Sequence, residues 1–478
     1  MYSANVMSLE TLASSTNPNL IILESRGAQR AVSKPPAAPK PASLGSSITI
    51  APTPEELRSR PTIPDRLGDL GIPRAMVSDL VLRYLWLHGT GTLALLHDTL
   101  KLSFPVLETV FHEFRQQQML EVKGMVGNDY TFSLTVAGRH LATARSEVCQ
   151  YVGPAPVSIQ QYHEVVRGQS AKLRLNRDSL RRAFNDLVLP DSLLDQLGPS
   201  LIGHQSLFLY GGTGSGKTSI AERILRIYQD TIIVPYAVEV DGHIIAVFDP
   251  IVHKQIEADD EFLDPRWVIC HRPCITMGGE LSAAMLELRL DESTHVFIAP
   301  CQMKANNGIL VVDDFGRQMV APQQLLNRWI VPLDRRVDYL TLSSGMKFQV
   351  PFELMVVFST NLDPSDLADE AFLRRIETKV LVEDVSDEIF DLIVKQVVTV
   401  HSVPAETGCA EYMRERCMAA GATTLRACYP MDILKLVKAI AEYEGRAVRM
   451  TRANIDRAVG LYFAKAPTRK RNPLIGEA

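Results

Sequence analysis

The stretch GGTGSGKT, at residues 211–218, decides the fold of this chain. The apolar run SLFLY precedes it at 206–210, and SIAERILRIY follows at 219–228 with apolar residues at helical spacing. A strand, a glycine-rich loop and a helix in this order match the pattern G-x-x-x-x-G-K-[ST], in which backbone N–H groups surround phosphate oxygens. The flanking strand and helix argue against a plain glycine turn, so the sequence predicts a phosphate-binding loop.

The residues of this loop have expected roles in holding ATP and Mg²⁺. The glycines let successive N–H groups point inward, and the positive end of the following helix adds to the field. Lys217 can neutralise the β- and γ-phosphates, and the Thr218 hydroxyl can ligate Mg²⁺. We expect nucleotide contacts from Gly211, Gly212, Thr213, Gly214, Ser215, Gly216, Lys217, Thr218 and Ser219.

Polar side chains follow two further apolar runs. ILVV at 309–312 leads into Asp313 and Asp314, at the strand end where open α/β sheets bind ligands. Asp313 is expected to hold Mg²⁺, and Asp314 to orient or deprotonate the attacking water. LMVVF at 354–358 precedes Asn361, which can hydrogen-bond the γ-phosphate or that water. The alternative for Asn361 is a turn-capping role before the Asp-Pro pair.

An arginine pair lies close to the next strand candidate. DEAFLRRIETK at 369–379 places Arg374 and Arg375 at the end of a short helix. One of them can serve as an arginine finger that reaches the γ-phosphate of a neighbouring subunit. A solvated basic pair is the alternative.

Strand and helix candidates alternate from about residue 200 to 380, with strands at 206–210, 309–312, 354–358 and 379–382. This alternation predicts an α/β fold, with a parallel sheet covered by helices on both faces. Helical patterns without strands follow at 387–401, 410–420, 431–443 and 452–463, and they predict a separate helical unit.

Residues 61–148 predict a small helical domain that ends in a hairpin. Helices are expected at 78–88, 92–100 and 104–118, with Phe104, Leu107, Phe111 and Phe114 on one face of the third. Alternating runs at 120–126 and 130–134 flank Gly-Asn-Asp, a hairpin signal.

Three helices and a hairpin resemble a winged helix, which would bind DNA through its third helix. That helix carries His112 and Arg115 but also Glu108 and Glu113, so it has little charge for phosphate neutralisation. We therefore favour a protein-docking or regulatory role over DNA binding.

Composition suggests the remaining boundaries. Residues 1–60, rich in Pro, Ala and Ser, are expected to be a disordered tail. We expect a Pro-rich connector that becomes helical at 149–199, the α/β core at 200–383, a helical lid at 384–465 and a basic tail at 466–478. Within the core, an insertion at about 231–270 contains an Asp241-Gly242 turn, which predicts a β-hairpin.

The whole-chain properties narrow the class of protein. The 478 residues are 46% hydrophobic, enough for sizeable cores, and the net charge of -5 gives no global sign of a nucleic-acid binder. Seven scattered cysteines fit a reducing compartment. No signal peptide and no bilayer-spanning apolar run is found, so a cytoplasmic protein without a membrane span is expected.

Three further stretches each allow a functional and a structural interpretation. Cys270, His271 and Cys274 supply too few ligands for a zinc site, which favours loop and strand residues. Gly278-Gly279 precedes a helix-like stretch and can be a pore-lining loop or a helix-start turn. Phe297 can grip a substrate, but core packing is favoured.

These motifs, in this order, resemble the AAA+ ATPase superfamily over roughly residues 180–465. The resemblance implies a five-stranded doubly wound sheet, a four-helix lid, and rings, expected to be hexamers, with ATP between subunits. KANNGILVVDDF at 304–315, QQLLNRWI at 323–330 and MKFQVPFELMVVFSTN at 346–361 are similar to the MoxR-type and σ54-activator branch. There, an added β-hairpin precedes the strand that leads into the asparagine. The chain also resembles a bacterial group with a winged-helix-like front.

Two positions depart from the superfamily pattern. Asp314 stands where most members have Glu, and Met431 stands where the lid arginine is expected, so Arg426 is the candidate substitute. The resemblance implies a Mg²⁺-dependent ATPase that remodels an unknown protein partner. The alternatives are an ATP-dependent regulator acting on DNA, and an ATP-binding switch with weak hydrolysis.

Overall fold

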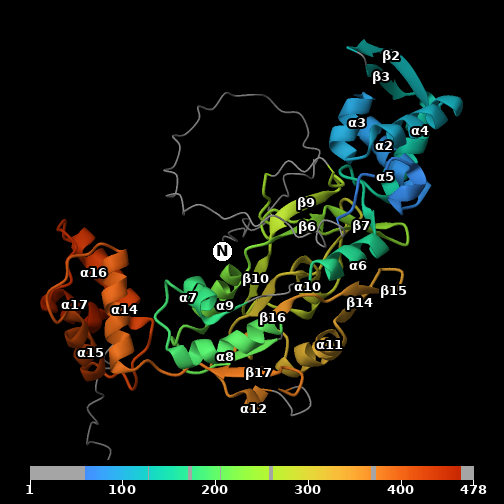
Figure 1. Cartoon of the computed structure of the whole chain (residues 1–478). Coiled ribbons are helices and arrows are strands. Elements are labelled where there is room, and N and C mark those ends of the chain that lie inside the picture. The colour runs from blue at the N-terminus through green and yellow to red at the C-terminus, as the bar shows by residue number, and fades with distance from the viewer. Residues whose placement is uncertain are drawn as a thin grey trace, which may run out of the picture.

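The computed structural model describes residues 60–127, 129–170, 175–204, 206–257, 262–367 and 373–463 (Figure 1). The predicted tails at 1–60 and 466–478 lie outside these residues, apart from Arg60. The four predicted core strands are β5 (Leu207–Tyr210), β13 (Ile309–Val312), β16 (Met355–Thr360) and β17 (Thr378–Leu381). With β10 (Cys274–Met277) they form a five-stranded sheet in the order β10-β13-β16-β5-β17, and every neighbouring pair is parallel. The α/β fold predicted from the sequence is confirmed.

Strand residues alternate between two cores, one on each face of the sheet. Leu207, Leu209 and Val311 pack with α7 (Arg177–Ala183), α8 (Asp191–Ile202) and α9 (Lys217–Ile224). On the other face, Phe208, Val312 and Phe358 pack with Trp329 of α11 (Pro322–Arg335). Because successive residues of a strand face opposite sides, continuous apolar runs are what a doubly covered sheet requires.

The edge strand β10 is the core element that the sequence did not reveal. It is short and mostly half-buried, so its apolar pattern is weak. It begins at Cys274, while Cys270 lies in β9 (Trp267–His271), so both cysteines are strand residues. Beyond Gly278 and Gly279 the chain forms only the 3₁₀ turn η3 (Ala283–Leu286), not the expected α-helix.

The predicted insertion hairpin is present. Strands β7 (Ala237–Val240) and β8 (His243–Ala246) pair around Asp241 and Gly242, both with positive φ, as a tight hairpin turn requires. The hairpin belongs to a second sheet, ordered β11-β12-β8-β7-β4, with β4 (Val157–Ser158), β11 (Arg289–Asp291) and β12 (Val296–Ile298). Phe297 of β12 is buried in this sheet's core, as favoured. β6 (Thr231–Pro235) pairs with β9 beside it.

A further hairpin, β14 (Val337–Thr341) and β15 (Lys347–Pro351), lies before β16. This is the position that the MoxR-type resemblance implies for an added hairpin. The remaining short elements are η1 (Leu67–Leu70), α6 (Ile159–Gly168), η2 (Leu225–Ile227), α10 (Cys301–Lys304) and α12 (Pro364–Leu367).

The predicted N-terminal helices and hairpin are α2 (Arg74–His88), α3 (Leu93–Leu100), α4 (Phe104–Gln116), β2 (Leu120–Val126) and β3 (Asp129–Leu134). The short β1 (Thr90–Gly91) completes a sheet with β3, and α5 (Val136–Val148), which was not predicted, packs on α2. Phe104 is 44% exposed, contrary to its expected place on the buried face of α4. It begins the helix and stacks on the His97 ring instead.

The N-terminal unit contacts the insertion through Arg266, whose charge is balanced by an ion pair within the insertion itself. The Arg266 guanidinium and the Asp264 carboxylate are 0% and 1% exposed, and their closest atoms are 2.7 Å apart. Arg266 also donates hydrogen bonds to the carbonyl oxygens of Leu70 and Pro156. Ala237 and Ile244 of the insertion share a core with α2 to α4. The N-terminal unit is therefore fixed to the second sheet.

The four predicted C-terminal helices are α14 (Asp387–Val400), α15 (Cys409–Ala419), α16 (Tyr429–Tyr443) and α17 (Arg452–Tyr462). They enclose their own apolar core and lie beside the sheet, at the opposite end from α2 to α5 (Figure 1). Of the helices described, none has the length and apolar character needed to cross a membrane.

Replacing one partner of the buried ion pair should lower the free energy of unfolding. Asp264→Asn leaves the Arg266 charge buried without its counter-ion, which costs about 3–5 kcal/mol. Urea denaturation followed by tryptophan fluorescence measures the loss. The control, Asp195→Asn, breaks the exposed Arg177–Asp195 pair and should cost less than about 1 kcal/mol. Equal costs for the two variants would contradict this assignment.

Candidate functional site

The glycine-rich loop joins β5 to α9 through three residues that need positive φ. Gly211, Gly214 and Gly216 have φ of 142°, 78° and 99°, angles that L-residues rarely adopt. A Cβ on Gly211 would also overlap the Val382 carbonyl oxygen, so glycine is required there for packing as well. The loop is thus held against the segment that follows β17.

Lys217 begins α9, and its ammonium group lies inside the loop. The side chain is 6% exposed, and Nζ donates hydrogen bonds to Gly212 O at 2.7 Å and Gly211 O at 3.1 Å. A further bond, 2.8 Å long, goes to Oδ1 of Asn361. Burial lowers the pKa of Lys217, and the nearby carboxylates of Asp313 and Asp314 oppose that shift. Among the described residues, the hydrogen-bond acceptors of this ammonium group are neutral oxygens, including Ser215 Oγ, so the group is well placed to receive an anion.

Thr218 and Asp313, the two expected Mg²⁺ ligands, lie in direct contact. The Thr218 hydroxyl donates to the Asp313 carboxylate, at 2.9 Å from Oδ2 and 3.1 Å from Oδ1. One hydroxyl and one carboxylate suit Mg²⁺, which prefers oxygen ligands and takes the rest from phosphates and water. In the part of the chain that the structure describes, no group of three or more His, Cys, Asp or Glu side chains gathers as a metal site. The residues present therefore fit a nucleotide-bound Mg²⁺ better than a protein-enclosed metal.

Asp314 lies beside Asn361, whose Nδ2 is 3.4 Å from Asp314 Oδ1. Asp314 has φ of 48°, and its neighbour Phe315 fixes this conformation by donating its N–H to Ser359 O at 2.7 Å. Asp adopts positive φ more readily than most L-residues. An aspartate therefore suits the backbone conformation at position 314.

The arginine pair lies away from these groups within one chain. Arg375 forms an ion pair with Asp334 of α11, 3.0 Å between Nε and Oδ2. Among the described residues that line the cavity at the phosphate loop, neither Arg374 nor Arg375 is found. The structure thus brings together Lys217, Thr218, Asp313, Asp314 and Asn361, but not the arginines.

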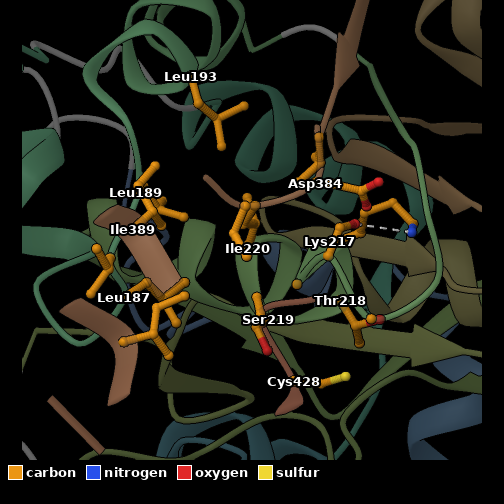
Figure 2. A pocket seen from close by; sticks show the side chains of 18 of the residues that line it. Leu187, Leu189, Leu193, Lys217, Thr218, Ser219, Ile220, Asp384, Ile389 and Cys428 are labelled. Carbon is orange, nitrogen blue, oxygen red and sulfur yellow. Dashed lines mark hydrogen bonds between the residues drawn. The ribbon is translucent and has the colours of Figure 1, made fainter. Parts of the chain in front are cut away.

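The cavity around the loop has a volume of about 1220 Å³ and two chemically different parts. The polar part contains the residues described above. Figure 2 shows the apolar part, where Leu187, Leu189, Leu193 and Ile389 lie on the side of Ile220 away from Lys217. No motif marks these residues in the sequence. The apolar run at 187–189 before a helix and the apolar spacing of 387–401 are the patterns that could have indicated them.

The lid reaches the loop through the start of α16. The Cys428 N–H donates to Gly214 O at 3.2 Å, and a Cβ on Gly214 would lie 2.6 Å from Cys428 Sγ. Arg426 packs against the same glycine, with Cδ 3.4 Å from that Cβ position, while Met431 lines the cavity. The candidate substitute for the lid arginine therefore lies next to the phosphate loop.

Comparisons with known proteins give a family of unknown function and distant structural neighbours. A family described as "Domain of unknown function (DUF8689)" matches residues 386–461. No curated protein matches the chain. NtrX from Brucella abortus superposes with a TM-score of 0.38 at 13% identity, over 61% of this chain and 59% of that chain, under two thirds of its length.

NtrX in complex with ADP gives a TM-score of 0.37 at 13% identity, over 70% of this chain and 68% of that chain. The RuvB Holliday junction branch migration motor of Thermotoga maritima gives 0.33 at 13% identity, over 61% and 72%. At such low similarity, these neighbours do not indicate the function of this chain, and the geometry of the site must do so.

The contact between the phosphate loop and the lid should be measurable as a coupling free energy between Gly214 and Cys428. Gly214→Ala should destabilise the protein, because its φ strains alanine by about 1–2 kcal/mol and its Cβ would meet Cys428 Sγ. Cys428→Ala removes that sulfur, so the double variant should lose at least about 0.5 kcal/mol less than the sum of the single losses. Chemical denaturation of the four proteins measures the cycle, and strict additivity would show that the contact does not form.

Proposed function

We propose that the chain is a Mg²⁺-dependent ATPase of the AAA+ type that uses hydrolysis to remodel a protein partner. One observation carries the proposal. Lys217, the Thr218–Asp313 pair and the Asp314–Asn361 pair converge in one cavity, although they follow three different strands. Phosphate binding, metal binding and water activation each have a matching group there.

The proposed chemistry is in-line attack of water on the γ-phosphate. Lys217 exchanges its loop carbonyls for β- and γ-phosphate oxygens. Thr218 and Asp313 would hold Mg²⁺, which supplies charge neutralisation of the phosphates when bound. Asp314 orients the water and accepts its proton, while the Asn361 amide fixes both the carboxylate and the water.

The apolar part of the cavity suits the base of the nucleotide. Leu187 and Leu189 on the core and Ile389 on the lid present aliphatic surface to a planar ring. A base bound there would touch the sheet domain and the lid together. ATP is therefore the proposed ligand, with its phosphates at the loop and its adenine between the two units.

The active site is proposed to be completed by a second copy of the chain, in a ring that we expect to be hexameric. Arg374 is exposed, whereas Arg375 is exposed only in part. We therefore assign Arg374 as the arginine finger that reaches the neighbour's γ-phosphate. Arg375 then positions the segment that carries it.

The partner is proposed to dock on the N-terminal unit, which has the element order of a winged helix. The exposed side of α4 carries Glu108, His112 and Arg115, and Glu113 is paired with Arg74. This mixed charge gives little phosphate neutralisation, which favours a protein partner over DNA. Seven free thiols agree with a reducing compartment, and we place the activity in the cytoplasm.

The DNA alternative predicts salt-sensitive binding of duplex DNA by the full chain, and titration at two salt concentrations tests it. Binding that weakens steeply with salt would favour the DNA-acting regulator over the remodelling function.

Mixing two inactive variants should restore hydrolysis if the finger acts between subunits. Arg374→Ala keeps the nucleotide site but should lower turnover about a thousandfold or more, and Lys217→Ala keeps the finger but loses the phosphate contact. In mixed rings, an intact site meets an intact finger, so phosphate release should rise well above that of either variant alone. Failure to recover, with co-assembly shown by size-exclusion chromatography, would refute a finger in trans.

The length of the side chain at position 314 distinguishes the proposed ATPase from the alternative, an ATP-binding switch with weak hydrolysis. Asp314→Glu should lower turnover roughly ten- to hundredfold, because the longer side chain displaces the carboxylate from Asn361 in a backbone suited to Asp. Asp314→Asn is the matched control and should abolish hydrolysis while ATP binding persists. Faster turnover by Asp314→Glu would favour the ATP-binding switch with weak hydrolysis.

A further inference from the structure

Asp384 lies in the short segment that joins the parallel sheet to the helical lid. It follows β17, which ends at Leu381, and precedes α14, which begins at Asp387. The Val382 N–H donates to Tyr210 O at 2.8 Å, so the segment runs beside the strand that leads into the phosphate loop. Displacement of residue 384 is therefore passed by the backbone directly to α14.

The Asp384 carboxylate packs against the start of the phosphate loop. A Cβ on Gly212 would lie 2.9 Å from Asp384 Oδ1. The carbonyl of the same glycine accepts the shortest hydrogen bond of the Lys217 ammonium, at 2.7 Å. Figure 2 shows Asp384 on the Lys217 side of the cavity. A negative charge thus lies beside the cation that the phosphates of a nucleotide would use.

Asp384 differs from the other carboxylates near Lys217 in its bonding. Asp313 is bonded to Thr218 and Asp314 approaches Asn361. Within the described ranges, no hydrogen bond or ion pair reaches the Asp384 carboxylate, and its side chain is exposed. It acts on Lys217 through charge alone and favours the protonated ammonium. It can therefore move without breaking a specific bond.

The neighbouring Glu383 provides an internal comparison. It is also exposed and also lines the cavity, and it carries the same charge one residue earlier. Asp384, and not Glu383, meets Gly212, and Asp384 is among the carboxylates that favour the charged form of Lys217. The position of the carboxylate, and not only its sign, distinguishes Asp384.

We propose that Asp384 is a charge sensor that couples phosphate binding at the loop to the position of the lid. The inference rests on the proposed function, since it needs a nucleotide at the loop. Phosphates that enter the loop bring negative charge next to the carboxylate, and like charges a few ångströms apart repel. Lys217 turns to the phosphates at the same time, so Asp384 loses its attraction to the loop. The carboxylate moves away and displaces α14 with it.

Reciprocity follows from this coupling. The free energy by which bound phosphate disfavours the Asp384–loop contact is the same free energy by which that contact weakens phosphate binding. Asp384→Asn removes the repulsion from the phosphates with almost no change of shape. Nucleotide affinity should therefore rise, and it should rise with the number of phosphates.

The test is a set of titrations with ATP, ADP and AMP in EDTA, by competition with a fluorescent ADP analogue. EDTA keeps divalent ions from neutralising the phosphates. Asp384→Asn should bind ATP roughly fivefold more tightly than the unmodified chain, with a smaller gain for AMP. High salt should reduce the gain, because the charges are exposed. Glu383→Gln, the matched control, should change these affinities much less.

A second measurement follows the lid directly. Amide hydrogen exchange at residues 387–400 should change when ADP binds to the unmodified chain, and should change less in Asp384→Asn. Unchanged or weaker ATP binding by Asp384→Asn, or an equal gain for ATP and AMP, would overturn the inference. If the unmodified chain binds none of the three nucleotides, the proposed function itself fails, and the first titration shows this separately.

Discussion

The hydrogen-bond register of β5 with its neighbours is the constraint on which the rest of the site depends. Tyr210, the last residue of β5, is paired with Thr360 on one side and with Leu381 on the other. The residues that follow these positions are Gly211, Asn361 and Val382, so the glycine-rich loop, the Asn361 amide and the segment before α14 leave the sheet at one level. A slip of one residue would turn every side chain of the strand to the other face and separate these groups.

The same constraint extends to the acidic pair. Val312 of β13 is paired with Phe358 of β16, which sets Asp313 and Asp314 beside the residues that lead into Asn361. The positive φ of Asp314 then directs its carboxylate toward the asparagine amide. Lys217, Asp313, Asp314 and Asn361 therefore form a group because three strands end together, and not because they are close in sequence.

The site also connects units that the sequence shows as separate. Cys428 bonds the loop from the start of α16, and Asp384 contacts the loop from the segment before α14. Nucleotide phosphates would meet both contacts at once, while the base would lie between Leu189 and Ile389. At the other end of the chain, Arg266 donates to Leu70 O, and Ala237 and Ile244 of the second sheet share the core of the N-terminal unit. The helical lid and the N-terminal unit are therefore both attached to the α/β core and its insertion.

Much of this arrangement could be predicted from the sequence, and the failures have identifiable causes. The strand 309–312 and the four lid helices were found because a doubly buried strand and an amphipathic helix have strong patterns. The strand β10 was missed because an edge strand needs few apolar residues, and α5 because its apolar side is narrow. The positions of Asp384 and Cys428 against the loop depend on contacts across the fold, which no local pattern encodes.

The most direct test of the central claim is steady-state ATP turnover measured against protein concentration with Mg²⁺ present. If the site binds ATP through Lys217 and is completed by an arginine from a second copy, turnover per subunit should rise steeply with concentration and then reach a plateau. Turnover that stays near background at every concentration, with ATP bound, would contradict the account.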